Sequence, residues 1–497
     1  MSAKYLLGID IGSSSVKTAL LNVDTGQPAG AAFSPNDEMP MISTQPGFAE
    51  QDPDRWWSEL INSLALLRKN YPFKAEEIAA IGISYQMHGL VCIDKNNKPV
   101  RHSIIWCDSR AVDIGNKAFR SLGEEFCLTN FLNSPGNFTA SKFKWVKDNE
   151  PEVFHRVHKI LLPGDYIALK LTGEPFTTVP GLSEGIMWNF SKNKVATELL
   201  DQYEINRSVV SDVVNTFSVQ GTLSVSAAEI LNLKPGTPVS YRAGDQPNNA
   251  FSLNVLQPGE IAATAGTSGV VYGVTDKVEY DRASRVNTFV HVNHSNEKPR
   301  YGILLCINGT GILNSWLKKN FFNGTSYNEM NNKAAQIKPG CEGLFIYPFG
   351  NGTERVLENR NNGASIRGLQ FNNHHQGHIA RAAQEGIVFS LYYGISIMKE
   401  MGMQVNKVRA GYSNMFLSET FAEAFANTAN ASLELYDTDG ATGAARAAGV
   451  GAGIYKSFNE SFEGMKKIKT IEPSEDKKNI YNDLYIKWKE GLNKIIN

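Results

Sequence analysis

The chain has 497 residues, 42% hydrophobic and 20% charged. A single core rarely extends beyond about 250 to 300 residues, so this length predicts two domains. The 49 Lys and Arg residues balance 50 Asp and Glu residues, which gives a net charge of −1. This balance provides no field for nucleic acid or an anionic membrane, so neither is an expected partner.

Cysteine usage and the N-terminal segment bear on the compartment. The five cysteines are too few and too scattered for a disulfide framework, and no C-x-x-C motif occurs. The segment after Met1 lacks the long apolar region of a signal peptide, and no run approaches the roughly 20 apolar residues of a membrane span. We therefore expect a cytoplasmic protein.

Two strand-like runs, 5–10 and 16–23, flank a turn rich in small residues at Ile11-Gly12-Ser13-Ser14-Ser15. The same arrangement returns at 261–265 and 270–274, around Gly266-Thr267-Ser268-Gly269. Two β-rich runs around such a turn predict a hairpin. Because the two turns lie about half a chain length apart, they suggest a duplicated domain. We place the boundary near residues 245–259 and divide the chain into 1–246 and 247–497.

Between and after these hairpins, strand-like and helical runs alternate, which predicts an α/β fold of mixed sheets covered by helices. Asp52-Pro53 is typical of a helix start, and apolar residues at helical spacing follow it. The expected elements, in chain order, are a helix from Pro53, strands at 78–84 and 91–94, a helix at 379–403, a strand at 405–410 and helices at 414–430 and 481–496.

The glycine and serine turns are candidates for binding phosphate. Small residues let backbone N–H groups approach anionic oxygens, and Asp10 at the end of the first strand could hold a cation beside them. An ordinary hairpin turn is the alternative, and the recurrence at Gly266 favours phosphate binding. A P-loop is excluded because Val16 and Ile11 stand where its glycines would be, and no G-x-G-x-x-G follows a strand.

Polar residues after other strands are candidates for a sugar site. Asp245, between Gly244 and Gln246, could act as a general base for a sugar hydroxyl, although an Asx turn is the alternative. Gln86-Met87-His88 and Asp108-Ser109-Arg110 carry groups that suit a polyhydroxylated ligand. The alternatives are a satisfied turn histidine at His88 and an ordinary helix-start acid and solvated base at Asp108 and Arg110. The run His374–His378 lacks acidic or cysteine ligands nearby, so we expect no metal there.

Together these segments resemble the FGGY family of carbohydrate kinases, over essentially the whole chain. Six motifs in order carry the resemblance: Gly8–Lys17, Gln86–Gly89, Trp106–Arg110, Gly244–Gln246, Gly266–Gly269 and Gly440–Ala445. The resemblance implies two ribonuclease-H-like domains of the actin and hexokinase superfamily with a ligand cleft between them. It also implies transfer of phosphate from ATP, with Mg²⁺, to a sugar, and a homodimer is compatible with it.

The resemblance also implies residue roles. Asp245 is the expected catalytic base and Asp10 the expected magnesium residue. The remaining expected contacts are Gly12, Ser13, Ser14, Lys17, Gly266, Thr267 and Ser268 to ATP phosphates; Gln86, Met87, His88, Asp245 and Gln246 to the sugar; and Gly311, Gly411 and Asn414 to adenosine.

Within the family, Met87 and His88 favour D-xylulose, which would give D-xylulose 5-phosphate during the use of xylose. Ribulose, sedoheptulose, glycerol and gluconate stay open as acceptors. Two residues depart from the family pattern. Tyr85 replaces the usual glycine before the Gln-Met-His motif and bears on the shape of the sugar pocket, whereas Tyr412 interrupts the glycine run and bears on the adenine contacts. A structural ATPase of the actin type would not need the Asp245 base, and a lapsed sugar-binding regulator would have lost Asp10, Asp245 or a hairpin.

Overall fold

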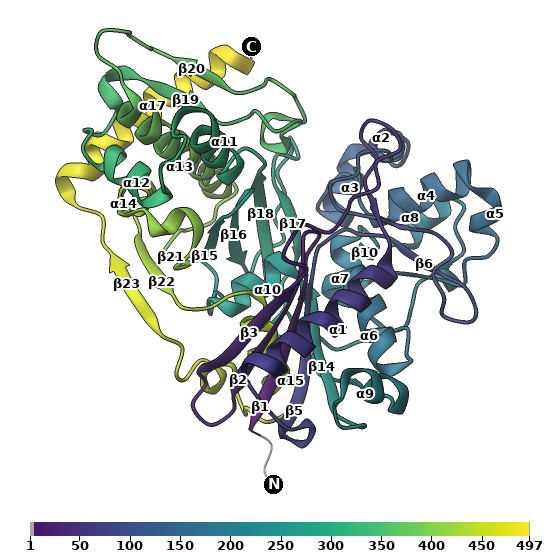
Figure 1. Cartoon of the computed structure of the whole chain (residues 1–497). Coiled ribbons are helices and arrows are strands. Elements are labelled where there is room, and N and C mark those ends of the chain that lie inside the picture. The colour runs from purple at the N-terminus through teal and green to yellow at the C-terminus, as the bar shows by residue number, and fades with distance from the viewer. Residues whose placement is uncertain (1–3, 497) are drawn as a thin grey trace. The chain divides into compact units, whose positions relative to one another are not determined.

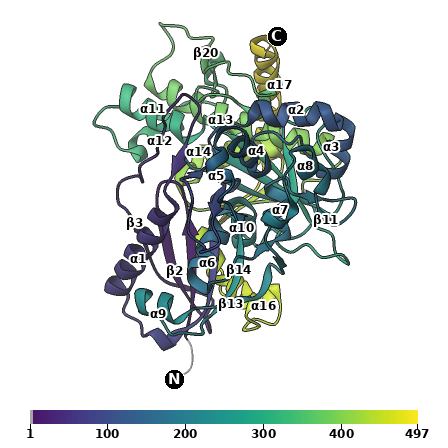
Figure 2. The ribbon, with the colours of Figure 1, turned by 90° about the vertical axis from the view of Figure 1, so that its right-hand side faces the viewer.

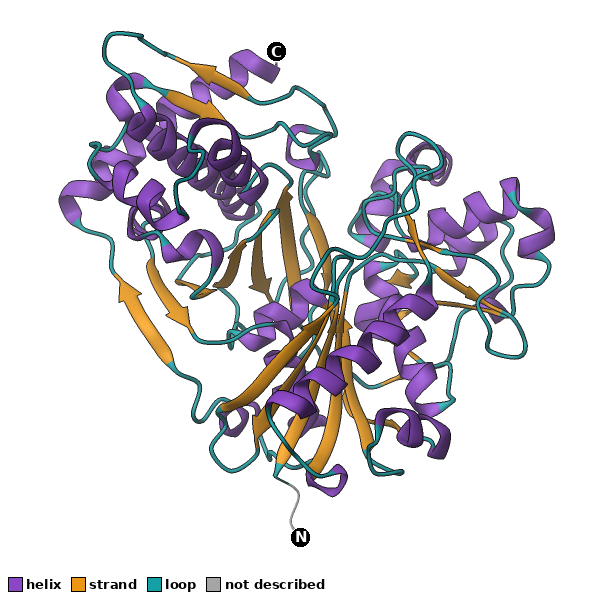
Figure 3. Ribbon diagram, in the orientation of Figure 1, coloured by secondary structure: helices purple, strands orange, loops and turns teal. Residues whose placement is uncertain are grey.

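The computed structural model describes residues 4–496, which divide into two compact units (Figure 1). Each unit is built on one large mixed sheet with helices packed against it (Figure 3). Neither unit is continuous in the sequence. Unit 1 contains the residues up to Asn254, Phe289–Arg300 and Thr438–Met465, and unit 2 contains Val255–Thr288, Tyr301–Asp437 and the residues from Lys466 onward.

The sheet of unit 1 has the strand order β13-β14-β5-β1-β2-β3. The first hairpin supplies its antiparallel part, in which β2 pairs with β1 and β3, whereas β5 and β14 run parallel to β1. β1 and β5 are buried along most of their length, as expected for central strands covered on both faces. The strands are β1 (Tyr5–Ile11), β2 (Val16–Asn22), β3 (Pro28–Ser34), β5 (Ile78–Tyr85), β13 (Phe217–Thr222) and β14 (Pro238–Gly244).

Helices cover both faces of this sheet. α1 (Pro53–Asn70) begins after Asp52, as predicted, and packs on β2 and β3 beside α6 (Pro163–Thr172) and α9 (Val225–Leu231) (Figure 2). Its apolar side shares a core with the odd-numbered residues of β1, such as Leu7 and Ile9. Because successive side chains of a strand point to opposite faces, Gly8 faces the other way, toward α15 (Gly440–Gly451).

Two glycines bring α15 into direct contact with the central strands. Gly8 and Gly82 are paired in register on β1 and β5. A Cβ atom at Gly8 would lie 1.8 Å from the carbonyl oxygen of Ala441, and one at Gly82 would lie 2.0 Å from that of Ala444. The missing side chains therefore let the helix backbone lie on the strand backbones, and its first residue, Gly440, reaches the end of β1.

Unit 2 repeats this architecture. Its sheet has the order β17-β18-β16-β15-β21-β22-β23. β16 pairs antiparallel with β15 and β18, β21 and β22 run parallel to β15, and β23 closes the sheet antiparallel to β22, just as β13 does beside β14. The duplication predicted from the two hairpins is thus confirmed. The strands are β15 (Glu260–Ala265), β16 (Gly269–Thr275), β17 (Asn287–Val290), β18 (Tyr301–Ile307), β21 (Lys407–Gly411), β22 (Ser432–Tyr436) and β23 (Lys467–Ile471).

The helix predicted for residues 414–430 starts later than expected. Asn414–Leu417 forms a 3₁₀ turn, and α14 begins at Glu419 because the Ser418 hydroxyl accepts a hydrogen bond from the Phe421 N–H and caps it. Asn414 itself is left-handed, with φ 52°. The helices of unit 2 are α11 (Gly311–Phe321), α12 (Tyr327–Ala335), α13 (Gln376–Glu400), α14 (Glu419–Ala429) and α17 (Glu475–Ile496).

Six of the remaining helices of unit 1 lie in the long connection between β5 and β13, and the other two follow β14 and α15. In residues 4–496, no helix is long and apolar enough to cross a membrane. The remaining helices of unit 1 are α2 (Val112–Leu122), α3 (Glu124–Phe131), α4 (Thr139–Asn149), α5 (Pro151–Phe154), α7 (Val179–Glu184), α8 (Thr197–Gln202), α10 (Asp245–Ser252) and α16 (Phe458–Ser461).

Gly82→Ala should test the contact between α15 and the sheet. Its new methyl group would overlap the Ala444 carbonyl, so we expect the free energy of unfolding to fall by about 1–3 kcal/mol. The matched control is Gly266→Ala, because the nearest atom to a Cβ there is 3.7 Å away. Urea denaturation of both variants measures the difference, and equal stabilities would contradict the close approach.

Candidate active site

The turn of the first hairpin is held by its neighbours. Ser15 closes it by accepting a hydrogen bond from the Gly12 N–H at 3.0 Å. The carbonyl oxygen of Ser13 accepts from the side-chain amide of Gln51 at 2.7 Å, and that of Ser14 accepts from the Met39 N–H at 2.8 Å. With these carbonyls already engaged, the turn has a fixed shape before any ligand arrives.

Asp10 stands at the end of β1, next to the start of α15. A Cβ atom at Gly440 would lie 2.6 Å from its Oδ2, so the helix terminus is in contact with the carboxyl group. Burial raises the pKa of Asp10, and the nearby Asp439 carboxylate adds to this. Lys17, its register partner on β2, and Ser84 act in the opposite direction.

Asp245 is the first residue of α10 and follows β14 directly. Burial, followed by the charge of Asp10, raises the pKa of Asp245 to about 7. An electrostatic interaction of this kind requires the two carboxyl groups to be near each other. The structure thus brings Asp10 and Asp245, which are 235 positions apart in the sequence, to one end of the unit 1 sheet.

The predicted sugar-binding residues lie at the same end. Met87 is 4% exposed, and its Cγ would be 2.6 Å from a Cβ atom at Gly244, so it packs against the turn that carries Asp245. The His88 ring lies against Phe138 and Phe289, with centroid distances of 4.8 and 5.4 Å. Met87 and His88 are therefore close to the candidate base.

Three buried amide oxygens near these acids have no hydrogen-bond partner within residues 4–496: Oε1 of Gln86, Oε1 of Gln246 and Oδ1 of Asn248. Buried acceptors are usually satisfied, so such atoms point to a ligand that donates. Sugar hydroxyls and metal-bound water both donate. Together with the carboxylates of Asp10 and Asp245, these oxygens also form the kind of donor set that suits Mg²⁺.

Two residues that the sequence analysis missed surround His88. Glu184, the last residue of α7, is 1% exposed and binds His88 through both its side chain and its backbone. Lys142 of α4 is 0% exposed and donates to the carbonyl oxygens of His88 at 3.0 Å and Ile105 at 2.9 Å. Burial lowers the pKa of Lys142 to about 8. We find no local sequence pattern that would have indicated either residue.

In unit 2, the second hairpin turn is joined to the start of α11. The carbonyl oxygens of Gly266 and Thr267 accept from the N–H groups of Gly311 and Ile312, at 2.9 and 3.1 Å. The amide of Asn414 lies 3.7 Å from the place where a Cβ of Gly266 would be. Gly411 ends the neighbouring strand β21, and Ser268 completes the turn. Unit 2 therefore contains the phosphate residues predicted for the second hairpin and the predicted adenosine residues, and Tyr412, next to Gly411, is 45% exposed.

Glu354 supports this region and was also missed. Its carboxylate accepts from the Asn308 N–H at 2.9 Å, just before α11, and burial raises its pKa to about 7. No local sequence pattern marks Glu354, because its role depends on a partner 46 positions away. Glu354 fixes the loop that leads into Gly311.

Asp108 and Arg110 serve the fold. Asp108 is buried, accepts from the Ala49 N–H at 2.6 Å and pairs with Arg110 at 2.7 Å. The alternative of a solvated base at Arg110 was wrong, because its guanidinium is buried over the ring of Phe48. These residues hold the loop that follows β7 (Ser103–Ile104).

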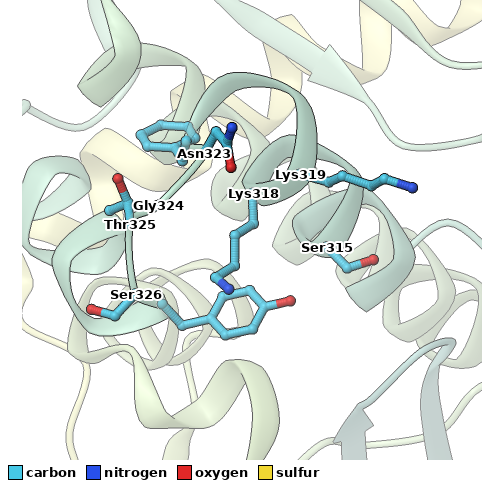
Figure 4. A pocket seen from close by; sticks show the side chains of 9 residues that line it. Ser315, Lys318, Lys319, Asn323, Gly324, Thr325 and Ser326 are labelled. Atoms are coloured by element: carbon cyan, nitrogen blue, oxygen red, sulfur yellow. The ribbon is translucent and has the colours of Figure 1, made fainter.

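Two other features lie outside the candidate site. Within the described part of the chain, no group of three or more His, Cys, Asp and Glu side chains is arranged to hold a metal ion, and the histidines of the run His374–His378 form no such group. A hollow of about 580 Å³ lies between α11 and α12, where Figure 4 shows Lys318 and Lys319 with Ser315 and Ser326. None of the predicted site residues lines it.

Several known proteins are similar to this chain over most of its length. A Bacillus subtilis xylulose kinase is 28% identical over 465 residues, covering 93% of this chain and 91% of the relative. An Escherichia coli L-xylulose/3-keto-L-gulonate kinase is 27% identical, covering 98% and 96%. The crystal structure of a ligand-bound xylulose kinase from Lactobacillus acidophilus has a TM-score of 0.89 at 22% identity, covering 100% and 98%.

Two protein-family models, one for each domain, together match most of the chain. Residues 5–252 match the N-terminal domain of the FGGY family of carbohydrate kinases, and residues 261–452 match its C-terminal domain. The mixed α/β fold expected from the resemblance is likewise confirmed. From its motifs, its duplicated sheets and these matches, the chain belongs to the FGGY family of carbohydrate kinases.

Proposed function

We propose that this carbohydrate kinase transfers the γ-phosphoryl group of ATP to D-xylulose and forms D-xylulose 5-phosphate. The observation that carries the proposal is Asp245, a carboxyl group with a pKa of about 7 next to Met87 and His88. Relatives named xylulose kinase support this acceptor. The relative named L-xylulose/3-keto-L-gulonate kinase makes another ketose the alternative.

Asp245 would act as the general base. As the sugar hydroxyl oxygen forms its bond to the γ-phosphorus, the hydroxyl proton moves to the Asp245 carboxylate, and the bond to the leaving oxygen of ADP breaks. A base with a pKa near 7 is half ionised at neutral pH and still strong enough to take the proton. The transition state is loose, so alignment of the hydroxyl matters as much as basicity.

Asp10 would hold Mg²⁺ through water, and the buried oxygens near it fit this role. The cation, when bound, neutralises charge on the phosphate oxygens. Lys17 adds a second positive charge near Asp10. We propose Gly12, Ser13 and Ser14 in unit 1, and Gly266, Thr267 and Ser268 in unit 2, as phosphate contacts, and Gly311, Gly411 and Asn414 as adenosine contacts. A cytoplasmic location, where ATP is plentiful, accords with this function.

A coupled assay of ADP release across D-xylulose, L-xylulose, D-ribulose, L-ribulose, glycerol, gluconate and sedoheptulose tests the acceptor. We expect the highest kcat/KM with D-xylulose. A clear preference for another acceptor would replace D-xylulose in the proposal but keep the kinase, whereas turnover with none of them would contradict both.

Asp245→Asn should keep the fold and ATP binding but lose most turnover, because an amide replaces the base at nearly constant shape. Removing a general base lowers the rate by about 10²- to 10⁴-fold. The control is Asp201→Asn, which changes an exposed aspartate on α8. Wild-type kcat with D-xylulose in Asp245→Asn would exclude Asp245 as the base.

The pH profile follows from the raised pKa of Asp245. Below pH of about 7 the group carries a proton and cannot accept another, so kcat/KM should fall about tenfold per pH unit toward acid. The same pKa shift means that ionising Asp245 costs folding stability as the pH rises through 7. Asp245→Asn should therefore melt at a higher temperature than the wild type at pH 8, and a lower melting temperature there would contradict the assigned pKa.

Asp10→Asn should change both rate and pH profile. Loss of the magnesium residue should lower kcat, and loss of its charge should lower the pKa of Asp245. We therefore expect the residual activity to keep its acid limb at a lower pH than in the wild type. Stopped assays from pH 5 to 9 at saturating Mg²⁺ measure this, and an unchanged midpoint would show that the two carboxyl groups are not coupled.

A further inference from the structure

His88 has an unusual backbone for a residue with a side chain. Its φ is 61°, in the left-handed region, which a non-glycine residue adopts at a cost and keeps only when its surroundings enforce it. Such residues concentrate at functional sites. Contacts with its surroundings must therefore hold His88 in this conformation.

Glu184 and Lys142 hold it from two sides. The Glu184 carboxyl oxygen Oε1 accepts from the His88 N–H at 3.4 Å, and Lys142 Nζ donates to the His88 carbonyl oxygen at 3.0 Å. Both backbone polar groups of the strained residue are thus bound by buried side chains. Glu184 belongs to α7 and is 96 positions away from His88 in the sequence. Lys142 belongs to α4 and is 54 positions away.

The ring of His88 is fixed as well. Its Nδ1 lies 2.9 Å from the backbone carbonyl oxygen of Glu184. A carbonyl oxygen can only accept, so in the neutral imidazole the proton is on Nδ1 and Nε2 is the acceptor nitrogen. Residue 184 therefore sets the tautomer of the ring, and its side chain binds the backbone of the same histidine.

Glu184 also contacts the turn that carries the candidate base. Its Oε2 lies 2.4 Å from the place where a Cβ of Gly244 would be, so this carboxyl group fills the space that glycine leaves. Burial raises the pKa of Glu184 well above its usual range, and the charges of Asp245 and Asp165 add to this. The protonated, neutral form of Glu184 is thus compatible with this buried position.

From these contacts we infer that Glu184 and Lys142 are positioning residues that determine sugar selectivity by fixing the backbone, ring orientation and tautomer of His88. The inference rests on the proposed function in one respect, namely that His88 contacts the sugar. Neither residue takes part in proton transfer to or from the substrate.

Kinetics of Glu184→Ala test the inference. We expect the KM for the preferred sugar to rise at least about tenfold, with the KM for ATP changed less than about twofold, because only the sugar contact is disturbed. Discrimination between D-xylulose and the other sugars should weaken. Glu184→Gln, which keeps the Oε1 acceptor and the shape, should restore most of the sugar affinity, and Lys142→Met should behave like Glu184→Ala.

A matched control separates selectivity from general damage. Glu59→Ala removes another buried glutamate of unit 1, a residue of α1 whose carboxylate binds Ser34, Asn62 and Arg55 and none of the site residues. It should lower stability but leave the ranking of sugars unchanged. A double-mutant cycle gives the decisive comparison: in a His88→Ala background, Glu184→Ala should have little further effect on the sugar KM. Additive effects would overturn the inference.

One measurement needs neither sugar nor variant activity. The ¹⁵N chemical shifts of the His88 imidazole in the neutral form, assigned by comparison with His88→Gln, should show the proton on Nδ1. A proton on Nε2 would overturn the inference even if D-xylulose proves to be the substrate. A proton on Nδ1 would support it even if the preferred acceptor is a different sugar.

Discussion

The site of unit 1 depends on the contact between α15 and the two central strands. Gly8 and Gly82 remove the side chains that would separate helix from sheet, so that Ala441 and Ala444 lie directly on β1 and β5. This brings the N-terminus of α15, at Gly440, against Asp10. A helix N-terminus carries partial positive charge and favours anions. The packing of α15 on the sheet therefore also places this positive helix end beside the Asp10 carboxyl group.

Burial of acids is the second constraint. Asp10, Asp245 and Glu184 all lie where burial disfavours their charged forms and raises their pKa values. The charge of Asp10 adds to the raised pKa of Asp245, and the charge of Asp245 adds to that of Glu184. An isolated buried carboxylate is costly, and the protein reduces the cost by keeping some of these groups protonated. The result is a base whose pKa lies near neutrality. The buried acids that the proposed chemistry needs therefore lower the free energy of unfolding. Strongly shifted pKa values of this kind are common at active sites.

The residues around the candidate site fall into two groups. Those of the first group are proposed to contact the ligand, and those of the second group hold the first group in place. Met87 and His88 lie next to the turn of Asp245, whereas Glu184 and Lys142 bind the backbone of His88. In unit 2, Glu354 has a similar task at the loop before α11. These supporting residues are buried and titratable, and each binds backbone polar groups of the residues it holds.

The sequence by itself determined the two hairpins, the duplicated α/β fold, the family and the candidate residues Asp10, Met87, His88 and Asp245, because each belongs to a local motif or to a regular pattern of apolar residues. The tertiary structure alone decided that Thr438–Met465 packs with unit 1 and that Glu184 and Lys142 hold His88. Local patterns report the hydrogen bonds and periodicity of single elements. A contact between residues 96 positions apart exists only once helices and sheets have packed, so no single segment carries its signature.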